Sequence, residues 1–131
     1  MANILLVDDD PQVAAANAAA LTANGHTVVT VTTTAEAAAA VAKSVPDAVI
    51  LEAMLDGAYA GFDLARTFAR DFPTLPLIML TRADEHLSAA ERRKQDRDGW
   101  LPVARFMEKP VATDVLLYEL DHALPSEASA H

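Results

Sequence analysis

The chain of 131 residues contains no cysteine, which excludes disulfide scaffolds, zinc sites built on cysteine, and thiol nucleophiles. Basic residues are also scarce, because 10 Lys and Arg stand against 19 Asp and Glu, giving a formal net charge of −9. Binding to a phosphate backbone depends on Lys and Arg. The composition therefore argues against a nucleic-acid binder and favours a protein or a cation as the partner.

Long apolar runs and a secretory leader are missing as well. No stretch approaches the roughly 20 apolar residues that a transmembrane helix needs, and the start, Met1-Ala2-Asn3, lacks the basic region of a signal peptide. We therefore expect no membrane association and a cytoplasmic location. The length predicts one domain over residues 1–124, followed by a flexible C-terminal tail at 125–131.

Five short apolar runs recur along the chain, separated by segments with helix signals. The runs are 4–7, 28–31, 48–51, 77–80 and 104–107. Continuous apolar runs of this length are typical of strands buried on both faces of a parallel sheet. Their alternation with helices predicts an α/β fold, a doubly wound (βα)5 sheet covered by helices on both faces.

The helix boundaries carry recognisable capping residues. Asp10 is a predicted N-cap before Pro11, and Thr33 with Glu36 forms a predicted capping box. The helices are predicted from Pro11 to the stop at Asn24-Gly25, from Thr33 to before Pro46, over 62–71, and over 113–124. In the last helix, the residues expected to face inward are Val115, Leu116, Leu120 and Leu124.

Polar residues follow four of the apolar runs. They are Asp8-Asp9-Asp10, Glu52, Thr81 and Lys109-Pro110. Parallel strands bring such residues to one edge of the sheet, where ligands bind. Carboxylates gathered there repel one another unless a cation intervenes, and oxygen ligands without His or Cys favour Mg²⁺. Thr81 and Lys109 suit an anionic phosphoryl oxygen. The alternative is that Asp8 and Asp9, like Asp10, only cap the first helix.

These motifs resemble the response-regulator receiver domains of two-component phosphorelay signalling, the chemotaxis-regulator-like family. The resemblance is carried by ILLVDDDP at 4–11, PDAVILEAML at 46–55, LIMLT at 77–81 and FMEKP at 106–110. It implies a flavodoxin-like fold with strand order 2-1-3-4-5 and a signalling module that is not an enzyme. The implied partners are a histidine kinase, an output protein, or both.

The resemblance also implies a magnesium site. In the family, an acidic pair matching Asp8 and Asp9 helps to hold Mg²⁺, and the residue matching Glu52 is the phosphoacceptor. Met54 would offer its backbone carbonyl as a further metal ligand. The expected metal ligands are therefore Asp8, Asp9, Glu52 and Met54.

Three further positions match residues that respond to the phosphoryl group in the family. Thr81 matches the switch hydroxyl, Lys109 matches the lysine that contacts the phosphoryl group, and Phe106 matches the aromatic side chain whose rotamer reports activation. The resemblance implies a cis bond before Pro110, which proline makes accessible. The alternative is a trans proline that ends the strand.

Glu52 departs from the family, which places an aspartate there. A phosphoacceptor must lie in line with the donor phosphorus, and one added methylene moves the carboxylate by roughly 1.5 Å, a displacement that can cost about a hundredfold. We therefore predict an atypical stand-alone receiver that is not phosphorylated in the ordinary way. The alternatives are a conventional Mg²⁺-dependent phosphoacceptor, using Glu52 or Asp56, and a domain in which Glu52 has no role and only the surface matters.

Two other departures concern loops. The second glycine after Glu52 is Gly61, which makes that loop one residue longer than in typical receivers. The segment 82–104 is unusually polar, and six of the ten basic residues lie within 91–109. This region, the fourth helix and fifth strand, is a candidate surface for an output partner or a homodimer. A solvated charged face is the alternative, and Trp100 covers the sheet edge or docks a partner.

One enzyme alternative remains. The spacing of Asp8 and Asp10 is similar to that of haloacid-dehalogenase-type phosphohydrolases, in which the first aspartate is the nucleophile. Pro11-Gln12 follows here instead of that family's usual residues, and the chain has no cap insertion. The four histidines have no metal-ligand spacing.

Overall fold

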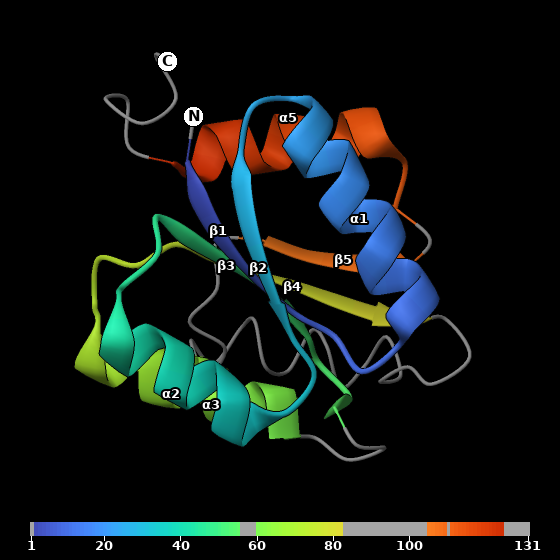
Figure 1. Cartoon of the computed structure of the whole chain (residues 1–131). Helices are drawn as coiled ribbons and strands as arrows, with labels where there is room; N and C mark the ends of the chain where they lie inside the picture. Colours follow the sequence, from blue (N-terminus) through green and yellow to red (C-terminus); the bar gives the residue numbers. More distant parts are fainter. Residues whose placement is uncertain (1, 56–59, 83–104, 110, 125–131) are drawn as a thin grey trace.

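A five-stranded parallel sheet forms the centre of the computed structural model, in the order β2-β1-β3-β4-β5 (Figure 1). The structure describes residues 2–55, 60–82, 105–109 and 111–124, with the backbone alone at 81, 82, 105, 106, 108 and 109. The strands are β1 (Asn3–Val7), β2 (Thr27–Val31), β3 (Ala48–Glu52), β4 (Leu77–Arg82) and β5 (Arg105–Lys109). The predicted α/β flavodoxin-like fold and its strand order are confirmed.

Helices cover both faces of the sheet. They are α1 (Pro11–Ala23), α2 (Thr34–Lys43), α3 (Ala60–Asp71) and α5 (Thr113–Ala123). Figure 1 shows α1 and α5 on one face, and α2 and α3 on the other. The predicted fourth helix and Trp100 lie outside the described residues. In the part of the chain that the structure describes, no helix has the length and apolarity required to cross a bilayer.

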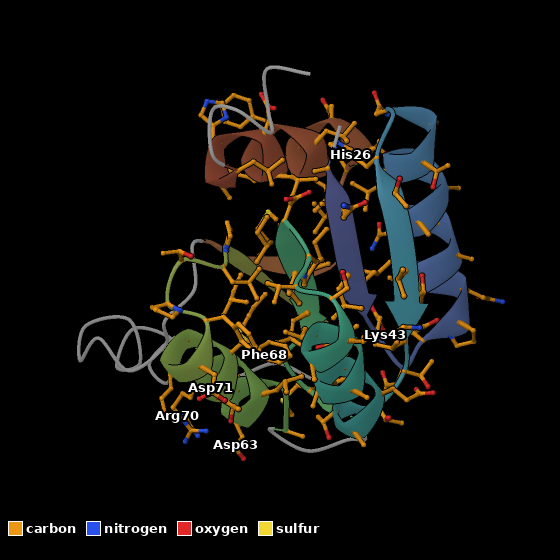
Figure 2. All side chains as sticks on the ribbon, turned by 60° about the vertical axis from the view of Figure 1, so that its left-hand side comes forward. His26, Lys43, Asp63, Phe68, Arg70 and Asp71 are labelled. Atoms are coloured by element: carbon orange, nitrogen blue, oxygen red, sulfur yellow. The ribbon has the colours of Figure 1, made fainter. Side chains whose placement is uncertain are left out.

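Each strand sends alternate side chains into two separate apolar layers. In β1, Leu5 and Val7 belong to the layer beneath α2 and α3, whereas Ile4 and Leu6 belong to the layer beneath α1 and α5. Figure 2 shows Phe68 directed from α3 toward the sheet, where it is 2% exposed. Burial on both faces explains why the central strands read as continuous apolar runs.

The predicted helix caps are present with one difference. Asp10 Oδ1 accepts hydrogen bonds from the backbone N–H groups at the start of α1, at 3.1 and 3.2 Å. Thr33 caps α2 by accepting the N–H of Glu36 at 3.1 Å. Glu36 Oε1, however, accepts from the N–H and hydroxyl of Thr32, both at 3.0 Å, one residue earlier than a capping box requires.

Two burial predictions are wrong. Val115 is 45% exposed, because the inward stripe of α5 follows the spacing of four residues set by Leu116, Leu120 and Leu124. The run 28–31 is not buried on both faces, since β2 lies at the edge of the sheet and Val29 is 54% exposed. An edge strand is bordered by only one neighbour, which leaves its side chains partly open to solvent.

Candidate functional site

The pairing of β1 with β3 places Asp8 and Glu52 at the same edge of the sheet. Val7 is opposite Leu51 in the ladder, so the two acidic residues follow at the same level. Both are almost fully buried, with 1% of Asp8 and 2% of Glu52 exposed. Burying a carboxylate is expensive unless it accepts hydrogen bonds. Hydrogen bonds must therefore offset the cost of burying the carboxylates of Asp8 and Glu52.

Asp8 serves the turn that leads into α1. Its Oδ1 accepts the backbone N–H of Asp10 at 2.9 Å, and its own N–H donates to Val31 O at 3.1 Å. Asp10 in turn caps α1. The cap reading is thus confirmed for Asp10, while Asp8 contributes one buried carboxylate to the edge and also orders the turn.

Glu52 is the last residue of β3, and its side chain bends back onto its own chain. Oε2 accepts the backbone N–H of Met54 at 2.8 Å. The segment that follows is held by two backbone bonds, from Ala53 N to Leu80 O at 2.8 Å and from Gly61 N to Ala53 O at 3.1 Å. The added methylene of glutamate is therefore accommodated by a local hydrogen bond at a fixed backbone.

Gly61 packs against the end of β3, whereas the sequence marked it only as a loop-length difference. It lies in the first turn of α3 and is buried. A Cβ atom there would lie 2.2 Å from Glu52 O and 2.6 Å from Ala53 O. Only glycine lets α3 approach the end of β3 so closely. The signal in the sequence was a glycine near the start of a strongly amphipathic helix, where alanine would otherwise be preferred.

The other predicted site residues are placed by their backbone. Glu52 is opposite Leu80, so Thr81 follows one step beyond it on β4. Thr81 is opposite Glu108, which puts Lys109 one step farther along β5. Phe106 lies in β5 opposite Met79. The described residues do not include Pro110 or the side chains of Thr81, Phe106 and Lys109, whose roles stay predictions.

Two of the predicted magnesium ligands, Asp8 and Glu52, lie at the same edge of the sheet. Asp8, Asp9 and Glu52 offer the hard oxygen donors that Mg²⁺ prefers. Among the described residues, however, no group of three or more His, Cys, Asp or Glu side chains is arranged to hold a metal ion. Glu52 Oε2 is instead engaged by the N–H of Met54. The ligand set stays a prediction.

Comparison with known proteins gives a consistent result. Residues 4–121 match the family profile for the response regulator receiver domain. The chain is 28% identical over 127 residues to Protein PilH of Pseudomonas aeruginosa, covering 95% of this chain and 98% of PilH. It is 33% identical over 129 residues to the transcriptional regulatory protein GlrR of Escherichia coli, covering 98% of this chain and 28% of GlrR.

The transcriptional regulatory protein TcrA of Mycobacterium tuberculosis is 44% identical over 78 residues, covering 60% of this chain and 30% of TcrA. The chain thus spans less than a third of the TcrA and GlrR sequences. Among solved structures, the receiver domain of NtrX from Brucella abortus is similar with a TM-score of 0.79 and 29% identity, covering 92% of this chain and 97% of that chain. The chain therefore belongs to the response-regulator receiver domain family of two-component signalling.

Proposed function

We propose that this receiver works through protein contacts and is not switched by ordinary aspartyl phosphorylation, because Glu52 occupies the phosphoacceptor position. Response regulators interact with histidine kinases and output domains, and receiver domains are signalling domains and not typical enzymes. The proposal concerns how this member of the family receives its signal. It extends to action in the cytoplasm, with Asp8 and Asp9 retaining at most weak affinity for Mg²⁺.

The observation that supports this proposal is the hydrogen bond that Met54 N–H donates to Glu52 Oε2. An acceptor carboxylate must attack a phosphorus atom in line and at close distance. Here the carboxylate is buried, lies one methylene farther from its backbone than an aspartate, and is oriented by that bond. Because Oε2 is held by this bond, the carboxylate can present Oε1 to a phosphorus atom only in the orientation that the bond fixes. Any other line of approach requires the side chain to rotate at a buried position, which opposes phosphoryl transfer.

The burial of this site also bears on the kind of signal that regulates such a receiver. A receiver that does not exchange a phosphoryl group keeps one arrangement at Glu52 and Asp8, which are both buried. Regulation then comes from the presence or absence of a protein partner on its surface. The predicted contact region, the fourth helix and fifth strand, includes residues 83–104, which lie outside the described structure.

The proposal is tested by incubating the protein with Mg²⁺ and acetyl phosphate and measuring its intact mass. We expect no gain of a phosphoryl group in the wild-type protein. A phosphoryl adduct that is lost in Glu52→Gln would identify Glu52 as a conventional acceptor and overturn the proposal. An adduct that persists in Glu52→Gln and is lost in Asp56→Asn would identify Asp56 as the acceptor and also overturn it.

The same protein preparation tests the phosphohydrolase alternative. Repeated turnover of a small phosphomonoester that disappears in Asp8→Asn would support an enzyme. We expect no turnover.

A further inference from the structure

The strand β2 lies at the edge of the sheet, is exposed, and consists entirely of β-branched residues. Its sequence is TVVTV, and within the described residues it pairs only with β1. Val29 is 54% exposed, and Thr27 and Thr30 are exposed as well. In Figure 1, β2 lies in front of the rest of the sheet. Strand edges are usually protected by charge, proline or a bulge, because they readily pair with another strand.

The backbone of β2 has a defined set of outward groups. Thr27 donates to Ala2 O at 2.9 Å, and Val31 O accepts from Asp8 N at 3.1 Å, so these residues direct their backbone groups to β1. In a parallel ladder this direction alternates, and the N–H and C=O groups of Val28 and Thr30 therefore point away from β1. The run ends at Thr32, whose N–H is taken by Glu36 Oε1.

The strand β2 lies within an uncharged stretch of sequence in an otherwise acidic chain. No Asp, Glu, Lys or Arg occurs from Pro11 to Ala35, a span that includes all of α1 and β2, although the whole chain has a formal charge of −9. The exposed side chains of α1 include small ones, at Ala15, Ala16 and Ala19. A second molecule can approach β2 without bringing like charges together along the strand.

We propose that two copies of this chain associate through β2, antiparallel, with a two-fold axis at Val29. Val28 of one copy then lies opposite Thr30 of the other, and the two residues exchange both of their backbone hydrogen bonds. The same exchange occurs on the other side of the axis, so all outward groups of Val28 and Thr30 are used. The two Val29 side chains meet at the axis as a non-hydrogen-bonded pair, the closer type.

The association is weak and depends on salt. Pairing of one short strand buries less surface than the roughly 1,000 Å² expected of a stable interface. Each copy carries a net negative charge, and added salt screens the repulsion between the two bodies. The dimer therefore becomes more populated as protein concentration and ionic strength rise. An interface held by ion pairs shows the opposite salt dependence.

Analytical ultracentrifugation of the whole chain, over a range of protein and salt concentrations, measures this equilibrium. Val29→Lys places two like charges at the axis and is expected to weaken association about fivefold. Val115→Lys is the matched control, since it makes the same change at a residue 45% exposed on α5. We expect it to leave the association unchanged. Circular dichroism verifies that both variants fold.

Amide hydrogen exchange identifies the strand directly. In dilute protein, we expect Val28 and Thr30 to exchange faster than Val29, because only Val29 donates to β1. At high concentration the exchange of Val28 and Thr30 slows, and Val29→Lys abolishes that slowing. A protein that stays monomeric at all concentrations and salts overturns the proposal. So does a dimer that is disrupted by Val115→Lys and not by Val29→Lys, or one that leaves the exchange of Val28 and Thr30 unchanged.

Discussion

Replacing Gly61 by alanine tests how closely α3 must approach the end of β3. The new Cβ would meet Glu52 O at 2.2 Å, Ala53 O at 2.6 Å and Ala53 C at 2.8 Å, all of them backbone atoms that cannot rotate away. Overpacking of this kind costs about 1–3 kcal/mol. Loss of the bond from Gly61 N to Ala53 O, at 3.1 Å, adds about 1 kcal/mol. The better helix propensity of alanine offsets at most about 1 kcal/mol.

The expected loss of unfolding free energy is therefore about 1–4 kcal/mol, measured by urea denaturation followed by circular dichroism. Gly25→Ala is the control, because Gly25 has a φ of 92° and alanine there strains the backbone between α1 and β2. Both variants lose stability, but only Gly61→Ala should shift the amide resonances of Glu52 and Ala53. A Gly61→Ala protein within about 0.5 kcal/mol of the wild type would refute the reasoning.

Three further predictions concern caps and pH. Asp10→Ala removes the cap of α1 and should cost about 1 kcal/mol in urea denaturation, with Asp10→Asn retaining most of the stability. Burial lowers the pKa of His26 below its ordinary 6.5, and its Nδ1 accepts the N–H of Ala2 at 3.2 Å beside α5 (Figure 2). The contribution of neutral His26 to the free energy of unfolding is complete above pH 6.5 and is lost as the pH falls through the lower pKa of the folded state. His26→Gln should therefore reduce the change of the urea midpoint with pH in that window. The backbone hydrogen bond from Thr32 lowers the pKa of Glu36 below its ordinary 4.5, so Glu36→Gln should remove a loss of stability seen only as the pH falls below 4.5.

The fold was largely predictable because its signals are local. Each strand in the middle of the sheet is a continuous apolar run, and Asp10 and Thr33 mark helix starts through contacts within three residues. The wrong predictions concern burial, which depends on neighbouring elements and not on the local sequence. Nothing within 28–31 says that this run borders only one strand, and nothing near Val115 says which stripe of α5 faces the sheet.

The site was predictable in its position and less so in its contacts. Topology alone brings Asp8 and Glu52 to one edge, as the ladder between β1 and β3 requires. The sequence could not reveal that the carboxylate of Glu52 turns toward Met54, because that depends on the backbone conformation after β3. It also gave no measure of how tightly Gly61 packs, since contacts of that kind join segments from two elements.

The exchange of Glu52 for aspartate tests the central claim most directly. Glu52→Asp shortens the side chain by one methylene at an otherwise unchanged edge, and it restores the residue type that the family uses for phosphoryl transfer. After incubation with Mg²⁺ and acetyl phosphate, we predict that Glu52→Asp gains the mass of one phosphoryl group while the wild-type protein gains none. Equal phosphorylation of the two proteins would contradict the account, and so would the failure of a folded Glu52→Asp protein to accept the group.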